Sequence, residues 1–257
     1  MPRLAFVLLS AIVCLAVSCG APEPRRATPD AEAPRPKVLY LTHSAGFKHD
    51  VVPLSMRLLP EIGRQHGFDV VVTKDLTFLS PEGLKPYDAV VFYTTGELPL
   101  SEEDKRTFLA WLRAGKGFVG IHSATDTFYQ WPEYGEMIGG YFDGHPWHEE
   151  VAVRVEDRTH PATRHLPDPW VLTDEIYQFR NWDRSTRHVL LSLDPSSVDL
   201  GAEGVKRTDR DFALSWTSTY GEGRVFYTAL GHRAEVWESP EYQRHLAGGI
   251  RWVLGVE

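Results

Sequence analysis

Cysteine is almost absent from this sequence. Cys14 and Cys19 are the two cysteines among its 257 residues, and both lie close to the amino terminus. From residue 20 onward the chain therefore has no thiol. A disulfide framework, a thiolate metal site and a catalytic cysteine are excluded for that part of the chain.

Basic residues are also in short supply. The sequence has 27 lysines and arginines against 35 aspartates and glutamates, for a formal net charge of −8. It shows no dense basic stripe of the kind that nucleic acid requires, so we expect no nucleic-acid partner. Residues 41–46 (LTHSAG), which follow the first predicted strand, also lack the glycine fingerprint of dinucleotide sites. We therefore expect no nucleotide cofactor.

A long hydrophobic run is missing as well. Residues 4–17 are apolar but too few for a membrane-spanning helix, and they follow a short basic start, which is typical of a signal peptide. The small residues before Cys19 resemble a bacterial lipobox, with Ala16 in place of the commoner leucine. Residues 1–19 are thus predicted to be a lipoprotein signal peptide with Cys19 as its lipidation site. An ordinary secretory signal or an uncleaved anchor is the alternative.

Residues 20–36 are rich in proline and poor in large apolar side chains. Such a composition cannot bury a core, so we predict a disordered tether there. Residues 37–257, roughly 220 in number, are enough for one domain with a well-filled core. The whole pattern predicts a protein anchored by lipid in the bacterial cell envelope, facing the periplasm or the cell surface, with the membrane as a partner.

Short apolar runs alternate with helical patterns in the first half of this domain. We expect strands at 38–42, 68–72, 89–93 and 117–121, and helices near 51–67 and 101–115. This order predicts an α/β fold with a flavodoxin-like, doubly wound and mainly parallel sheet. The second half is richer in strands, which we expect at 151–155, 189–193, 212–219 and 224–230. It ends in a helix opened by Ser239 and Pro240.

Histidines stand where two of these strands end. In doubly wound sheets the ligand site lies beyond the carboxyl ends of the strands, which here are followed by His43 and His122. A sharp turn after Ile121 would lift His122 out of the sheet, as a nucleophile elbow does. Ser123 is a weaker candidate nucleophile, because it lies one place beyond the crest and lacks a glycine two places later.

Six motifs, in order along the chain, resemble the ThuA (trehalose utilisation) family. They are residues 43–49 (HSAGFKH), 120–129 (GIHSATDTFY), 139–147 (GGYFDGHPW), 174–177 (DEIY), 223–228 (GRVFYT) and 230–232 (LGH). The resemblance implies a fold similar to that of class I glutamine amidotransferases. Those enzymes carry cysteine at the elbow where this chain has His122, so we expect no amidotransferase activity.

The same motifs supply the candidate site. We predict His122, Glu175, His43 and Asp126 as catalytic residues and His122, His145 and His232 as ligands of a divalent metal, zinc or manganese. Acid–base chemistry by these groups without a metal is the alternative, and Asp174 and Glu175 could instead form a solvated pair. Tyr129, Trp131 and Trp147 are predicted to stack against a sugar, unless they cover the sheet edge. His148, directly after the third motif, is a further, weaker candidate. Six histidines are expected at the surface or in caps; they are His49, His66, His160, His165, His188 and His245.

The family resemblance implies a carbohydrate-active protein. We expect it to transform a disaccharide or keto-glycoside by hydrolysis, lyase-type cleavage or isomerisation, with a small-molecule sugar as substrate. The alternative is a non-catalytic carbohydrate-binding lipoprotein that serves a partner oxidoreductase or transporter. A metal-dependent esterase or amidase is a third interpretation.

Overall fold

This computed structural model describes residues 1–2 and 34–256. The predicted signal peptide, the Cys19 lipidation site and most of the predicted tether lie outside the described residues. The chain divides into two units, Met1–Pro34 and Arg35–Glu257, and all that follows concerns the second. Among the described residues, no helix is both long enough and apolar enough to cross a membrane.

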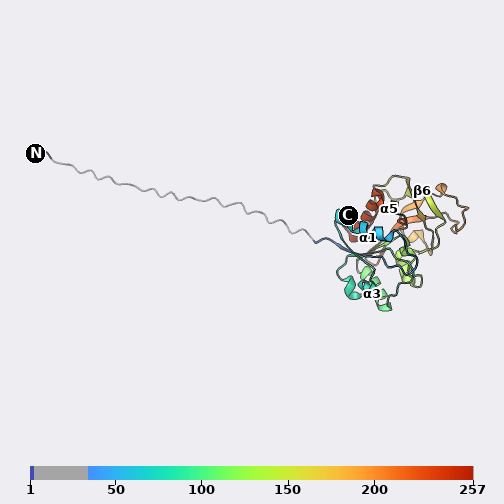
Figure 1. The fold of residues 1–257 in the computed structure, drawn as a ribbon, viewed down its shortest axis with the longest axis horizontal. Helices are drawn as coiled ribbons and strands as arrows, with labels where there is room; N and C mark the ends of the chain where they lie inside the picture. Colours follow the sequence, from blue (N-terminus) through green and yellow to red (C-terminus); the bar gives the residue numbers. More distant parts are fainter. Residues whose placement is uncertain (3–33, 257) are drawn as a thin grey trace. The chain divides into compact units, whose positions relative to one another are not determined.

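A nine-stranded sheet is the centre of the fold (Figure 1). Five strands form a parallel half, in the order β2 (Asp69–Thr73), β1 (Lys37–Leu41), β3 (Ala89–Phe92), β4 (Gly117–Ile121) and β11 (Gly223–Thr228). Four more continue it as an antiparallel half, in the order β10 (Ala213–Tyr220), β9 (His188–Leu193), β6 (Trp147–Val155) and β7 (Trp170–Ile176). The predicted doubly wound fold with extra strands in its second half is thus confirmed.

Helices cover both faces of this sheet. Their bounds are α1 (Val52–His66), α2 (Pro81–Leu84), α3 (Glu102–Arg113), α4 (Pro132–Ile138), α5 (Ala234–Glu238) and α6 (Pro240–Leu254). Figure 1 shows α1 and α5 on one side of the strands and α3 on the other. Ser101 and Ser239 cap α3 and α6 by accepting hydrogen bonds from backbone N–H groups in the first turn, as their positions predicted.

The parallel strands are buried along their whole length at the centre of the sheet. Every residue of β3 and β4 is buried, which explains why these segments read as continuous apolar runs rather than alternating ones. Because β1, β3, β4 and β11 are parallel neighbours, their carboxyl ends meet at one edge. The loops that begin at Thr42, Tyr93, His122 and Ala229 therefore lie side by side.

In the antiparallel half, the end of β7 lies at the carboxyl edge of the parallel strands. Four strands separate β4 from β7 within the sheet, yet the side chains of His122 and Glu175 are 3.3 Å apart. The antiparallel half must therefore bend over the carboxyl edge of the parallel half. A two-stranded sheet, β5 (Tyr141–Phe142) with β8 (Phe179–Arg180), follows the ends of α4 and β7.

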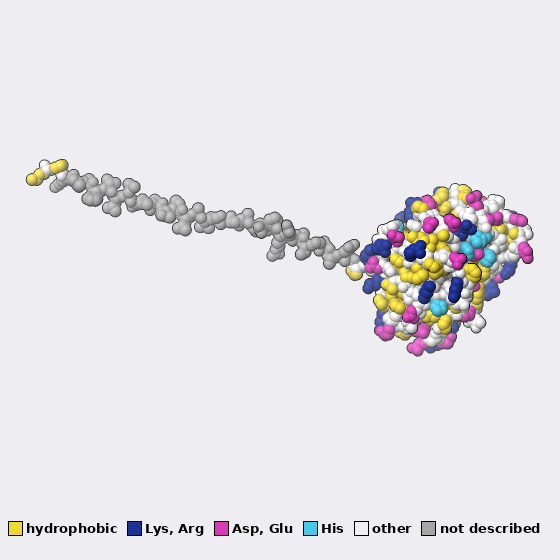
Figure 2. All heavy atoms as spheres, viewed as in Figure 1, with side chains coloured by type: hydrophobic (Ala, Val, Ile, Leu, Met, Phe, Trp, Pro, Cys, Tyr) yellow, Lys and Arg dark blue, Asp and Glu magenta, His cyan; other side chains and the backbone are white. Residues whose placement is uncertain are grey.

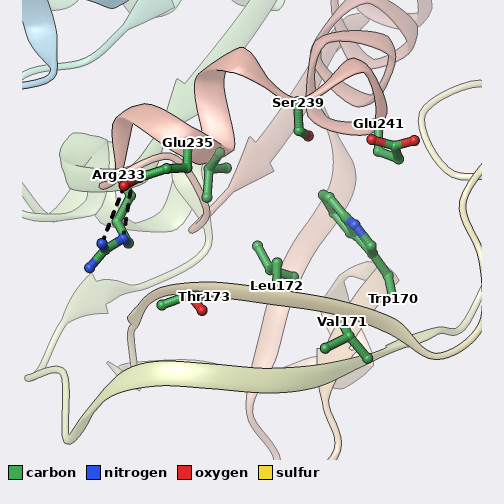
Figure 3. A pocket seen from close by; sticks show the side chains of 9 residues that line it. Trp170, Val171, Leu172, Thr173, Arg233, Glu235, Ser239 and Glu241 are labelled. Carbon is green, nitrogen blue, oxygen red and sulfur yellow. Dashed lines mark hydrogen bonds and ion pairs between the residues drawn. The ribbon is translucent and has the colours of Figure 1, made fainter.

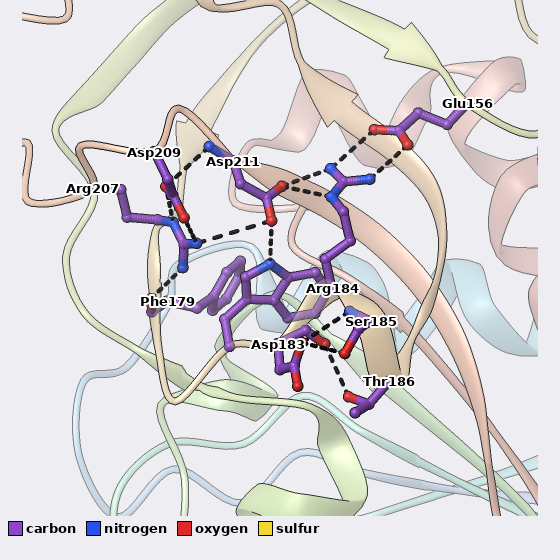
Figure 4. A network of polar contacts seen from close by, with 10 residues as sticks. Glu156, Phe179, Asp183, Arg184, Ser185, Thr186, Arg207, Asp209 and Asp211 are labelled. Carbon is purple, nitrogen blue, oxygen red and sulfur yellow. Dashed lines mark hydrogen bonds and ion pairs between the residues drawn. The ribbon is translucent and has the colours of Figure 1, made fainter.

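A network of charged side chains holds the loops of this antiparallel half (Figure 4). The guanidinium of Arg184 bonds to both Glu156 and Asp211, and Asp211 also accepts a hydrogen bond from the indole N–H of Trp182. Arg207 pairs with Asp209 beside them. A single exposed ion pair stabilises a protein little, but a network with two-pronged arginine contacts fixes loop geometry.

Candidate functional site

His122 stands on the sharp turn that the sequence predicts at the end of β4. Its backbone has φ of +46°, a left-handed conformation that is strained for a residue with a side chain, and a 3₁₀ turn (His122–Thr125) follows at once. The side chain is fully buried. A neighbouring strand stabilises this conformation, because the hydroxyl of Tyr227 on β11 donates a hydrogen bond to the carbonyl of His122.

The two ring nitrogens of His122 have different partners. Nδ1 lies 2.6 Å from the carbonyl oxygen of Ala229, and a carbonyl can only accept, so Nδ1 carries the proton. In the neutral ring, Nε2 then presents a lone pair. The hydroxyl of Tyr177 lies 2.9 Å from Nε2 and donates to it. His122 is thereby held in one tautomer with Nε2 facing the site.

Glu175 and His232 meet His122 at this nitrogen. His232 Nδ1 is 3.2 Å from His122 Nε2 and 3.2 Å from Glu175 Oε2, while His122 Nε2 is 3.3 Å from the same carboxylate oxygen. Burial alone would raise the pKa of the Glu175 carboxyl, but the imidazoles of His122 and His232 hold this pKa below its usual range. The hydrogen bond with Glu175 in turn raises the pKa of His232.

Asp174 fixes the loop that carries His232. Its buried carboxylate accepts hydrogen bonds from the backbone N–H groups of Gly231, His232 and Arg233, at 2.7, 3.1 and 3.2 Å. The hydroxyl of Tyr93 donates to the carbonyl of Gly231 from the other side. Asp174 and Glu175 are both buried, so the alternative of a solvated pair is wrong.

His49 completes the group, and the sequence analysis did not find it. This residue was expected at the surface or in a cap, but only 7% of it is exposed, and its ring centroid lies 4.9 Å from that of His122 and 5.3 Å from that of His232. Burial lowers the pKa of His49 to about 3, and the charges of the two other histidines lower it further. The sequence feature that could have identified His49 as a site residue is its position in the loop after the first strand, in the same motif as His43.

These four side chains have the composition of a divalent metal site. We call them the histidine–glutamate cluster, and its members are His49, His122, Glu175 and His232. Each member offers one nitrogen or oxygen atom, and these four atoms lie within 4.8 Å of one another. Three imidazoles and one carboxylate suit zinc and similar divalent ions.

Two observations show that the residues present fit such an ion. Nδ1 of His49 is buried without a hydrogen-bond partner among the described residues. His122 Nε2, His232 Nδ1 and Glu175 Oε2 also lie within 3.3 Å of one another, an arrangement that a cation among them would stabilise. The bond from His122 Nδ1–H to a backbone carbonyl is the usual outer support of a metal-bound histidine.

His145, a predicted metal ligand, lies at the rim of the cluster. Its Nδ1 is 3.6 Å from Glu175 Oε1, and half of the side chain is exposed. Within the cluster, the structure brings together His122 and His232 of the predicted ligands and adds His49. His148 is exposed and touches His232 edge-on, with ring centroids 5.0 Å apart.

A small cavity opens beside the cluster, between His145 and Asp126. It has a volume of about 190 Å³, and Glu175 and Tyr177 also line it. Asp126 accepts a 2.6 Å hydrogen bond from the hydroxyl of Tyr129, and burial raises the pKa of Asp126. The structure therefore places Asp126 at the mouth of the cluster, with Tyr129 engaged in orienting it.

The remaining predicted residues lie outside the cluster. His43 bonds to the backbone carbonyl of Lys74 and lines a neighbouring cavity of about 460 Å³, which shares His49 with the cluster. Trp131 is buried against Phe128 and other core rings. Trp147 is buried too, and its indole N–H donates to a backbone carbonyl. Neither tryptophan presents an open face for stacking.

Two other features lie at the surface of the domain. Figure 2 shows histidine side chains grouped at the surface on one face of the domain. A cavity of about 390 Å³ lies between edge strand β7 and the helices α5 and α6, where Trp170, Leu172 and Arg233 line it (Figure 3). No member of the histidine–glutamate cluster lines that cavity, so it is a separate feature.

Comparisons with known proteins agree with this architecture. A family model described as trehalose utilisation (ThuA) matches residues 37–253. No curated protein sequence matches the chain. A protein from Bacteroides uniformis described as ThuA-like is 26% identical, covering 89% of this chain and 95% of that one, with a TM-score of 0.73. A second ThuA-like protein, from Parabacteroides merdae, is 24% identical, covering 86% and 90%, with a TM-score of 0.68.

A more distant structure is similar in fold alone. A Thermoplasma acidophilum protein described as part of GMP synthase is 11% identical, covering 86% of this chain and 94% of that chain, with a TM-score of 0.50. This likeness agrees with the glutamine amidotransferase-like fold that the sequence predicts.

Proposed function

This chain belongs to the trehalose utilisation (ThuA) family, and we propose that it transforms a disaccharide or keto-glycoside at the histidine–glutamate cluster. The observation that carries the proposal is the convergence of four side chains from four separate segments at the carboxyl edge of the sheet. Buried acceptors that face one another are costly unless a cation or a proton lies between them. Such an arrangement is retained for chemistry more readily than for stability.

A divalent ion of the zinc or manganese type, held by the cluster, would polarise a carbonyl or hydroxyl oxygen of the sugar. The chain's own residues prepare for this. The carbonyl of Ala229 holds the ring of His122, and Asp174 holds the loop of His232. These supports keep the ligand atoms from rotating away and so reduce the reorganisation that binding requires.

Proton transfer is assigned to groups at the mouth of the cluster. Asp126 lines the small cavity and is oriented by Tyr129, so its carboxyl can exchange a proton with a sugar placed there. His145 stands half-exposed on the opposite wall, within reach of Glu175 and of solvent, and can return that proton. This division of roles suits hydrolysis, lyase-type cleavage and isomerisation alike.

The cellular setting is part of the same proposal. The signal-like amino terminus and Cys19 favour a lipid-anchored protein of the bacterial cell envelope. A sugar oxidoreductase partner would supply the keto-glycoside there.

The test measures metal content and turnover together. Full-length protein is loaded with zinc or manganese and incubated with disaccharides and their 3-keto forms. His122→Gln removes a central ligand and should lower both metal content and turnover by at least roughly 100-fold. The matched control is His188→Gln, which should change neither; His188 is the exposed first residue of β9 and pairs with Asp157.

Two outcomes would contradict the proposal. If His122→Gln keeps its metal and turnover, the cluster is not the site of the reaction. If the wild-type protein binds sugar without metal and without turnover, the carbohydrate-binding lipoprotein is the better description.

A further inference from the structure

A second polar cavity lies away from the cluster, between α6, the carboxyl end of α1 and the segment 161–165. Its volume is about 270 Å³. Five basic side chains line it: His66, Arg164, His165, Arg244 and Arg251. Among the described residues that line this cavity, none is acidic. Burial lowers the pKa of both histidines, so the three arginines carry the positive charge. In a chain with a formal net charge of −8, their grouping around one cavity needs a reason.

The sequence of α6 builds this cavity. Arg244, Ala247, Gly248 and Arg251 follow the i, i+3, i+4, i+7 spacing of one helix face. Because Gly248 has no side chain, the backbone of Pro161 packs directly against α6, where a Cβ would clash with its carbonyl oxygen. Gly248 and Pro161 thus form a firm floor between the two arginines, and we call this part of the cavity the notch.

Backbone carbonyls hold three of the basic groups in place. Arg251 donates to the carbonyl of His66 at 2.7 Å, and Arg244 donates through Nε to the carbonyl of Pro240 at 3.3 Å. His165 Nε2–H donates to the carbonyl of Glu241 at 2.9 Å. Arg244 and Arg251 each donate one N–H to the backbone and keep their other N–H groups for a ligand. Side chains held in this way lose less entropy when they bind.

The remaining charge on these groups is poorly balanced. Arg164 makes no side-chain hydrogen bond or ion pair with the described residues, and its guanidinium is exposed. Within residues 34–256, the one carboxylate that pairs with Arg244 is that of Glu241, at 3.8 Å and at the surface. An ion pair of that length in water neutralises little charge.

We propose that this cavity binds a phosphate group. Guanidinium groups recognise phosphate through paired N–H donors, which suits three arginines around one notch. The volume is at the lower limit of small-molecule sites, so it admits a phosphate or phosphomonoester rather than a nucleotide. Free phosphate and a phospholipid headgroup share this chemistry. No residue of the histidine–glutamate cluster lines the cavity, so this inference does not depend on the proposed function.

Calorimetric titration of full-length protein with inorganic phosphate at low salt tests the proposal. Arg164→Gln and Arg244→Gln should each weaken phosphate binding by roughly tenfold or more, because each removes a charge-assisted hydrogen bond. Neither side chain packs in the core, so both variants should fold. The matched control is Arg57→Gln on α1, where Arg57 donates to the carbonyl of Pro53 as Arg244 does to that of Pro240.

Vesicles separate the two sources of phosphate. If vesicles with phosphatidylglycerol compete with inorganic phosphate and plain phosphatidylcholine vesicles do not, the ligand is an anionic lipid headgroup. If inorganic phosphate binds and neither vesicle competes, the ligand is free phosphate. Absence of phosphate binding in the wild type, or equal weakening by Arg57→Gln, would overturn the proposal.

Discussion

The tautomer of a single histidine determines what the site can do. The carbonyl of Ala229 keeps the proton of His122 on Nδ1, so that Nε2 faces Glu175 and His232 as an acceptor. A second buried ring nitrogen, Nδ1 of His49, has no hydrogen-bond partner among the described residues. At the residue scale, the site is therefore defined by nitrogen and carboxylate oxygen atoms that lie close enough together to hold one cation.

His49 and His145 should differ in what they contribute. His49→Gln removes a buried member of the cluster, and metal affinity should fall by more than the roughly 10–100-fold that loss of an outer support costs. His145→Gln changes a rim residue, so metal content should stay near that of the wild type while turnover falls. Metal analysis after dialysis and steady-state rates measure both effects. Loss of metal in His145→Gln with retention in His49→Gln would reverse the assignment.

Strand ends and motifs predicted part of this site. His122 follows an apolar strand, and Glu175 and His232 fall in family-like motifs, so local pattern was sufficient to identify them. His49 was missed because its burial depends on how the loop after β1 packs under β7 and the 229–232 loop, which no local pattern encodes. For the same reason the open faces expected of Trp131 and Trp147 could not be judged before their burial was known.

At the scale of the element, α6 contains a buried histidine with a clear effect on acid stability. His245 is fully buried, and its Nδ1 lies 2.9 Å from the carbonyl of Ala162. Burial lowers the pKa of His245 to about 3, and the charges of His165 and His160 lower it further, although the hydrogen bond with Ala162 opposes this. In the unfolded chain a histidine has a pKa of about 6.5.

This difference destabilises the fold as the pH decreases. Below pH 6.5 the unfolded state binds a proton that the folded state cannot accept, so stability is lost progressively from pH 6.5 down toward pH 3. Between pH 7.5 and pH 5.0 one such histidine accounts for about 2 kcal/mol of the free energy of unfolding. His245→Asn, which keeps a donor toward Ala162, should reduce the loss over this interval by that amount in urea unfolding. Parallel pH profiles of the variant and wild type would contradict this.

Helices and strands with a clear pattern of apolar residues were predicted well. Elements whose polar residues are satisfied by tertiary contacts were not. The four parallel strands and both long helices of the first half lie within a residue or two of their expected bounds. β7 was missed because Thr173, Asp174 and Glu175 make it too polar for a buried strand. Those polar groups are tolerated because backbone N–H groups and histidines satisfy them.

At the scale of the whole molecule, the bend of the antiparallel half is what creates the site. It brings Glu175 from edge strand β7 to His122 on central strand β4, across four intervening strands. Strand order and bending follow from long-range packing. The fold class could therefore be predicted from the sequence, while the position of its last strand over the site could not.

The proposed attachment of the whole molecule to the membrane can be tested by replacing Cys19 and Cys14 one at a time. Cys19→Ala removes the proposed lipidation site, and acyl chains stabilise membrane binding by about 0.8 kcal/mol per buried CH₂. The variant should therefore move from the membrane fraction to the soluble fraction of lysed cells, whereas Cys14→Ala, inside the proposed signal, should leave the protein on the membrane. Immunoblots of the separated fractions, with detergent-phase partitioning, give the measurement. A soluble wild-type protein, or a Cys19→Ala variant that stays with the membrane as Cys14→Ala does, would mean that no lipid is attached at Cys19.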